Sequence, residues 1–168
     1  MKKKINLYSI KKIFIHIGLH KTGTSSIQNI LFNNHKKLIK KKILYPKTIT
    51  SINFNKENKL ILEKNPKNLF DHNPIEDVKY SNFNNNLFYR DLENEIKDNP
   101  NCDTLILSAE NLYYTEKKRI NELKFLFKDT KVKIIFVRRN YFDWLDSIYF
   151  EKIFSGQSCY SFDVFFHK

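Results

Sequence analysis

The chain contains the stretch Lys12-Ile13-Phe14-Ile15-His16-Ile17-Gly18 early in its sequence, followed directly by Leu19-His20-Lys21-Thr22-Gly23-Thr24-Ser25-Ser26. The first part is rich in β-branched and aromatic residues and ends at a glycine, which is typical of a buried strand. The second part is a polar loop. From Ser25 to about Lys37 the apolar residues have helical spacing, at Ile27, Ile30, Leu31 and Leu38. A strand, a loop and a helix in this order begin a βαβ unit.

The rest of the chain repeats this alternation of strands and helices. Further strands are predicted at Ile43–Tyr45, Thr104–Leu107 and Val132–Val137. Helices are predicted from Leu87 to just before Asn99-Pro100, from Glu116 to Lys128 with Ile120, Leu123 and Phe127 inward, and from Asn140 to Phe154. Such alternation predicts an α/β fold in three layers, with a central parallel sheet flanked by helices. Ligands of these sheets bind beyond the carboxyl ends of the strands.

Composition excludes several classes of protein. The chain has 168 residues, 41% of them hydrophobic, which suits one domain with a substantial core rather than disorder. No apolar run approaches the ~18 residues of a membrane span, and we expect a cytoplasmic protein. The net charge of +12 accompanies abundant Lys, Asn and Ile, so an anionic small ligand is favoured over specific nucleic-acid binding. Cys102 and Cys159 lie far apart and predict buried free thiols, with no metal site.

The loop between the first strand and the first helix has the composition of an anion site. Its glycine, hydroxyls and Lys21 stand at a helix N-terminus, where N–H groups without intrahelical partners and the helix dipole favour phosphate or sulfate. The order of residues is not that of a Walker A motif, because Lys21 comes before Gly23 rather than after the last glycine. The alternative is an ordinary capped turn, with Thr24 or Ser25 as the N-cap.

The same residues carry a resemblance to a known family. Phe14 to Gln28, with His20-Lys21-Thr22-Gly23-Thr24 followed by serines, resembles the 5′-phosphosulfate loop of sulfotransferases that use 3′-phosphoadenosine 5′-phosphosulfate (PAPS), and looks closest to the bacterial carbohydrate-type branch. The resemblance implies a P-loop-like domain. It also implies that Lys21 neutralises the bridging oxygen as sulfate leaves, and that the 5′-phosphate is held by the residues of the loop: His20, Lys21, Thr22, Gly23, Thr24, Ser25 and Ser26.

A second stretch, Ile135 to Tyr149, resembles the 3′-phosphate motif of that family. In that motif an arginine at the end of a strand is followed eight positions later by a serine on the next helix, and Arg139 and Ser147 have this spacing. A guanidinium fork suits a terminal phosphate, and a helical serine two turns on can add a hydroxyl donor. We expect Arg138, one residue earlier, to be a surface or carboxylate-pairing arginine.

Two residues are candidates for the catalytic base. Glu110 follows the third strand in Ser108-Ala109-Glu110, which looks like the carbohydrate-type pattern, and a carboxylate there can deprotonate a hydroxyl acceptor. Its alternative role is to cap the following helix. His72, in Phe70-Asp71-His72-Asn73-Pro74, is the second candidate. His20 is open between a contact to sulfate or acceptor and a supporting role.

The resemblance implies sulfuryl transfer from PAPS to a hydroxyl of a carbohydrate, a bacterial surface glycan, without a metal. We expect one sulfotransferase-like domain over 1–168, with the 5′-phosphosulfate unit at 12–46, a variable acceptor region at 47–84, and the base and 3′-phosphate region at 104–152. Family members carry a further basic segment near the C-terminus. This chain ends at Lys168 without it, which indicates a truncated reading frame or a reduced relative. A noncatalytic nucleotide-binding domain and a small-molecule kinase are the alternatives.

Overall fold

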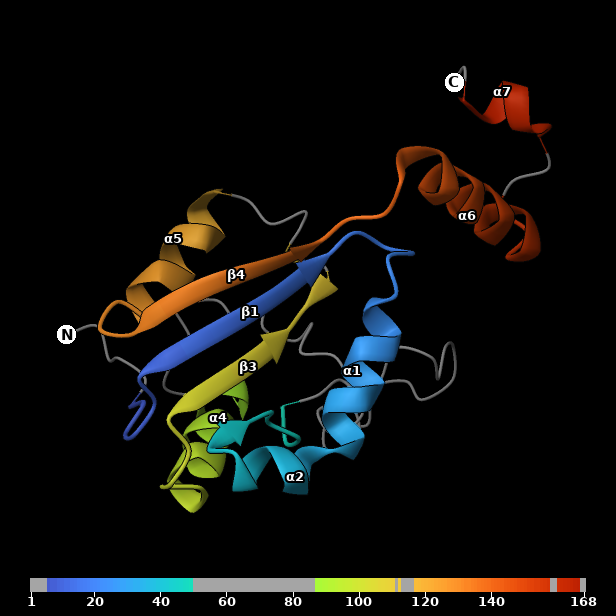
Figure 1. The fold of residues 1–168 in the computed structure, drawn as a ribbon. Helices are drawn as coiled ribbons and strands as arrows, with labels where there is room; N and C mark the ends of the chain where they lie inside the picture. The colour runs from blue at the N-terminus through green and yellow to red at the C-terminus, as the bar shows by residue number, and fades with distance from the viewer. Residues whose placement is uncertain (1–5, 50–86, 111, 113–116, 158–159, 167–168) are drawn as a thin grey trace.

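The computed structural model describes residues 6–49, 87–110, 112, 117–157 and 160–166. Within them, four parallel strands form one sheet in the order β2-β3-β1-β4 (Figure 1). The strands are β1 (Lys12–Gly18), β2 (Ile43–Leu44), β3 (Thr104–Ser108) and β4 (Lys131–Val137). The helices are α1 (Thr24–Asn33), α2 (His35–Lys40), α4 (Leu87–Asp98), α5 (Lys117–Leu126), α6 (Tyr141–Phe154) and α7 (Phe162–Phe166). The predicted α/β fold, with a central parallel sheet flanked by helices, is confirmed.

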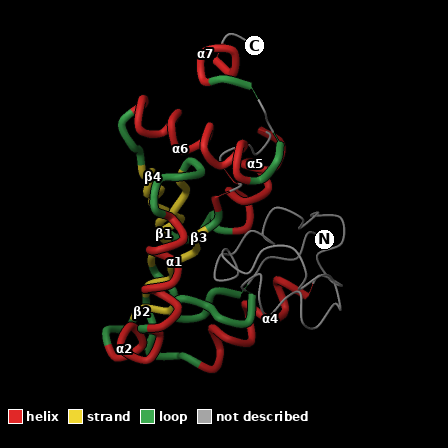
Figure 2. The backbone as a smooth tube through the Cα atoms, turned by 90° about the vertical axis from the view of Figure 1, so that its right-hand side faces the viewer, coloured by secondary structure: helices red, strands yellow, loops and turns green. Residues whose placement is uncertain are grey.

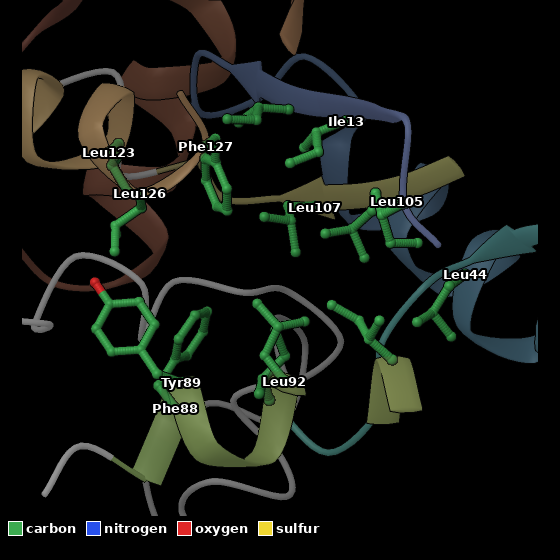
Figure 3. Close-up of a cluster of buried hydrophobic side chains, with 14 of the residues drawn as sticks. Ile13, Leu44, Phe88, Tyr89, Leu92, Leu105, Leu107, Leu123, Leu126 and Phe127 are labelled. Carbon is green, nitrogen blue, oxygen red and sulfur yellow. The ribbon is translucent and has the colours of Figure 1, made fainter. Parts of the chain in front are cut away.

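The apolar core lies on the face of the sheet that α4 and α5 cover (Figure 3). Ile15 of β1 pairs in register with Leu107 and Ile134, and side chains in register share a face. Fully burying an aliphatic or aromatic side chain contributes about 1.5–3 kcal/mol, so the buried side chains of this core are the main source of stability. Its buried members from the two helices are Phe88, Tyr89, Leu92, Ile96, Leu123 and Leu126.

The opposite face is more polar and is covered by α1. His16, next to Ile15, points to this face and pairs in register with Ser108. Gln28 of α1 reaches the same serine, with 3.1 Å between Gln28 Nε2 and Ser108 Oγ. Figure 2 shows the layers from the side, with α4 and α5 to the right of the strands and α2 to the left. The carboxyl ends of β1, β3 and β4 all point toward the loop that precedes α1 (Figure 1).

Several predicted details are wrong. The helix expected over residues 25–37 is two helices, because Asn34 leaves the helical conformation (φ −95°, ψ 14°) while its side-chain amide donates to Ile30 O at 2.8 Å. Asparagine competes in this way with the backbone ladder. Ile120 lines a cavity together with Ile15 of the sheet and Leu123, as its inward prediction requires, but it is 43% exposed, whereas Leu123 and Phe127 are buried as expected. Tyr45 follows β2 rather than ending it, and α7 has no counterpart among the predicted elements.

The chain leaves the sheet after β4, one of its two edge strands. Figure 1 shows α6 beyond the carboxyl ends of the strands and α7 beyond α6. Several apolar side chains of this region are exposed, among them Ile134 of β4 and Phe142 and Phe154 of α6. None of the helices in the described ranges has the length and apolarity needed to cross a membrane.

Candidate functional site

The loop between β1 and α1 makes two sharp backbone turns. Lys21 (φ 67°) and Gly23 (φ 84°) both adopt the left-handed region, which glycine tolerates best. Gly18 is needed for a different reason, because a Cβ at that position would collide with the side chain of Thr24. The glycine thus lets the start of α1 fold back against the end of β1. A compact loop is the result, at the carboxyl edge of the sheet.

The helix α1 begins without a side-chain cap. Its N-cap residue is Gly23, no side chain hydrogen-bonds to the cap, and the first turn has no acidic residue. The alternative of an ordinary turn capped by Thr24 or Ser25 is therefore wrong. The hydroxyl of Thr24 donates instead to Glu110, and that of Thr22 donates to Leu19 O at 2.7 Å. The N-cap residue therefore offers no side chain of its own to the start of the helix, and the positive end of a helix dipole favours an anion.

Glu110 lies just beyond β3 and reaches this loop with both carboxylate oxygens. Thr24 Oγ1 donates to Oε1, and His20 Nδ1 lies 3.1 Å from Oε2. Only 4% of the Glu110 side chain is exposed, against 41% for His20. The sequence predicts Glu110 only as a base or a helix cap just past the third strand, and the structure places its carboxylate against the loop. The pairing with His20 is additional, and nothing in the spacing of the two residues indicated it.

A buried polar cluster lies beneath the loop, on the α1 face of the sheet. His16 Nδ1 lies 2.7 Å from Ser108 Oγ, which also accepts from Gln28. Burial lowers the pKa of His16, and the Glu110 carboxylate opposes this in part. His16 Nε2 and Gln28 Oε1 are buried without a hydrogen-bond partner among the described residues. Sequence reasoning missed this cluster; the one signal was a histidine within an otherwise apolar strand.

Arg139 and Ser147 meet directly, as their spacing predicts. Arg139 Nη1 donates to Ser147 Oγ at 2.8 Å and to Lys21 O at 3.3 Å. The second contact exists because β4 neighbours β1, so the residues after β4 lie beside the loop after β1. Asn140 begins α6 by accepting a hydrogen bond from Phe142 N at 3.0 Å, which fixes where the helix starts. The role of Arg139 and Ser147 in binding phosphate stays a prediction.

The helix α6 holds the loop through two further contacts that sequence reasoning missed. Trp144 Nε1 donates to His20 O at 2.9 Å. Lys21 Nζ lies 2.9 Å from Glu151 Oε1. With the guanidinium of Arg139 on Lys21 O, three side chains from this region contact two consecutive loop residues. The sequence did not predict partners for Trp144 and Glu151, because these contacts depend on α6 lying beyond the carboxyl ends of the strands.

The remaining predicted residues are distributed as follows. Ser25 and Ser26 lie in the first turn of α1, the former half-buried and the latter exposed. His72 and Cys159 lie outside the described residues. Cys102 is a buried free thiol as expected, and burial raises its pKa. Across the described part of the chain, no three His, Cys, Asp or Glu side chains gather as a metal site would require.

Comparisons with known protein families, with curated proteins and with solved structures found no match to this chain. The site residues form two adjacent groups, the β1–α1 loop and the Arg139–Ser147 pair, with Glu110 joining the end of β3 to His20 of the loop.

Proposed function

We propose that this chain transfers a sulfuryl group from PAPS to a hydroxyl of a carbohydrate, a bacterial surface glycan. One observation carries the proposal: Arg139 Nη1 bonds both Ser147 Oγ and Lys21 O, so a guanidinium on β4–α6 is joined to the loop on β1–α1. PAPS carries anions at both its 5′ and 3′ positions. Two neighbouring anion-binding groups, one at a helix N-terminus and one an arginine fork, match that distribution of charge.

The residues divide the reaction between them. The N-terminus of α1 and the hydroxyls of Ser25 and Ser26 hold the 5′-phosphosulfate, and Lys21 neutralises the bridging oxygen as the S–O bond breaks. Arg139 and Ser147 hold the 3′-phosphate. The acceptor oxygen attacks sulfur in line, its proton passes to the pair formed by Glu110 and His20, and 3′-phosphoadenosine 5′-phosphate (PAP) leaves. No metal is required by this assignment of roles.

A noncatalytic nucleotide-binding domain is the second candidate. The observation that favours it is the burial of Glu110, whose two oxygens already contact Thr24 and His20. A binding protein would use the two anion-binding groups in the same way and would release PAPS unchanged. Binding alone therefore does not separate the two candidates, and turnover must be measured.

The test is to incubate the purified chain with ³⁵S-labelled PAPS and a panel of bacterial polysaccharides, and to follow both PAP release and label in the polymer. The proposal expects PAPS-dependent transfer that persists in EDTA. Arg139→Ala should reduce it, whereas Arg138→Ala, at the exposed neighbouring position, is the matched control. Binding of PAP without any turnover would establish the noncatalytic candidate instead, and labelling from ATP that depends on Mg²⁺ would indicate a kinase.

A further inference from the structure

We propose that the acceptor sugar carries an alkyl chain, as in a glycolipid, and that the cavity between α5 and the sheet holds this chain. The inference rests on the proposed sulfuryl transfer and names the class of its acceptor. The observation behind it is the cavity itself, which has a volume of about 370 Å³ and is lined mainly by aliphatic side chains. Sites for small molecules typically have volumes of roughly 300–1,000 Å³ and mostly apolar linings.

The sheet side of the cavity is made by two neighbouring strands. β1 contributes Ile15 and Ile17, and β4 contributes Val132 and Ile134. Residues two apart in a strand share a face, so these side chains all lie on the α5 side of the sheet. Among the described residues of the lining only Lys124 is charged, and its side chain is exposed. Such a lining offers an alkyl chain contact along its length but offers a sugar almost no hydrogen-bond partners.

The protein itself covers this lining only in part. The side chains of Ile120, Val132 and Ile134 are exposed, whereas Ile15 and Leu123 are buried. An alkyl chain bound against the exposed members would remove apolar surface from water, which is favourable. The volume of the cavity suits a chain of this kind, whereas a stable complex with another protein needs an interface of about 1,200–2,000 Å².

The cavity lies next to the residues proposed to carry out the transfer. Leu112 of the lining follows Glu110 by two residues, which places their Cα atoms at most about 7 Å apart. Ile17 of the lining directly precedes Gly18, where β1 ends. Val132 lies four residues before the position in register with Ile17, so the lining extends roughly 13 Å along the strands. A chain bound here would leave its sugar at the carboxyl edge of the sheet, near Glu110.

The first test measures binding and needs no turnover. Calorimetric titration with methyl, hexyl, octyl and decyl β-D-glucosides, each below the concentration at which it forms micelles, gives the dependence of affinity on chain length. We expect the affinity to rise roughly fourfold for each added methylene, and to level off once the cavity is filled. An affinity that does not depend on chain length would overturn the inference.

Two consecutive isoleucines of β4 provide a matched pair of variants. Ile134 lines the cavity, whereas Ile135 is also exposed but lies on the α1 face, because successive residues of a strand alternate. Ile134→Thr keeps a β-branched side chain and should weaken octyl glucoside binding roughly fourfold to 15-fold, the scale of one or two methylenes. Ile135→Thr should bind like the wild type. Equal losses in the two variants would overturn the assignment of the chain to this cavity.

A third variant fills the cavity without changing a strand. Ile120 is an exposed residue of α5, so Ile120→Trp should fold, place an indole in the cavity and abolish the dependence of affinity on chain length. Sedimentation equilibrium at the same protein concentrations should show a monomer. A dimer that Ile134→Thr dissociates, in a protein that does not bind octyl glucoside, would assign the cavity to a second copy of the chain and overturn the inference.

The second test uses transfer and separates this inference from the function on which it rests. With ³⁵S-labelled PAPS, octyl glucoside should have a lower KM than methyl glucoside, and Ile134→Thr should lose most of this preference while Ile135→Thr keeps it. Transfer to lipid-free polysaccharides with none to octyl glucoside, or equal KM values for the two glucosides, would keep the proposed function and overturn only the acceptor class. Binding that depends on chain length without transfer to any acceptor would overturn the proposed function itself.

Discussion

Lys21 and Glu151 form an ion pair, with 2.9 Å between Nζ and Oε1, that joins the β1–α1 loop to α6. Both side chains are partly exposed, at 35% and 48%, and such pairs typically contribute only about 0–1 kcal/mol. A phosphosulfate bound at the loop would bring more negative charge than one carboxylate. The ion pair is therefore weak enough for Lys21 to exchange Glu151 for the bridging oxygen of a nucleotide.

This exchange makes Lys21→Ala the informative variant. We expect it to lower turnover by ~10²–10³, the scale of one lost donor to charge that develops in the transition state. Glu151→Gln removes the competing carboxylate and should leave turnover intact, with nucleotide affinity equal or slightly higher. Steady-state kinetics on the three proteins decides the point. A folded Lys21→Ala variant with near wild-type turnover would reject the role of Lys21.

Gly18 should not tolerate a side chain. A Cβ there would collide with Thr24, so Gly18→Ala has to displace the start of α1 and should lower the free energy of unfolding by about 1–3 kcal/mol. Gly23→Ala is the comparison, because no atom lies within 4 Å of a Cβ there and only its φ of 84° is strained. That strain costs roughly 1–2 kcal/mol. Urea unfolding measures both losses.

The two glycine variants should differ in one further respect. Because Thr24 donates to Glu110, displacing Thr24 in Gly18→Ala should also disturb the carboxylate and the His20 contact. An unchanged stability in Gly18→Ala would mean that the loop does not pack as tightly against β1 as described.

Stability should fall in mildly acid solution because of His16. Burial lowers the pKa of this histidine below its ordinary value of 6.5, with the Glu110 carboxylate acting in the opposite direction. The unfolded chain therefore binds a proton at a higher pH than the folded chain, and the free energy of unfolding decreases as pH falls below about 6.5. Stability is restored above that pH.

The variant that isolates this effect is His16→Gln, which keeps a hydrogen-bonding side chain and removes the titration. We measure the free energy of unfolding by urea titration between pH 5 and pH 8. This free energy should change less steeply with pH in His16→Gln than in the wild type. Equal slopes would show that other groups cause the acid sensitivity.

The fold was predictable where periodicity is local. The β-branched runs at β1 and β4 and the apolar spacing of α4 predicted their elements well. The first strand and α4 each bury a regular face, whereas β4 is exposed along its length except at the half-buried Val137. The two helices in place of one at Asn34, and the exposure of Ile120, were not predictable in this way. The break at Asn34 depends on its side chain competing with the backbone for a hydrogen bond. The exposure of Ile120 depends on how α5 packs against the sheet. Neither is a property of the local pattern of apolar residues.

The site was predictable where a motif carries its own spacing. Arg139 and Ser147 are eight residues apart on one strand–helix unit, so their contact follows from local geometry. The pairs His20–Glu110, Trp144–His20 and Lys21–Glu151 join segments about 90 or more positions apart. Their contact depends on the order of strands in the sheet, which the sequence alone did not determine.

The most direct test of the central claim, that the chain reads both anions of PAPS, is a calorimetric titration with PAP and with adenosine 5′-monophosphate. These nucleotides differ only in the 3′-phosphate. We expect the wild type to prefer PAP, Arg139→Ala to lose ~10- to 150-fold in PAP affinity, Arg139→Lys to recover part of it, and Ser147→Ala to lose about 1 kcal/mol. Arg138→Ala should bind like the wild type. Equal affinity of the wild type for both nucleotides would contradict the account.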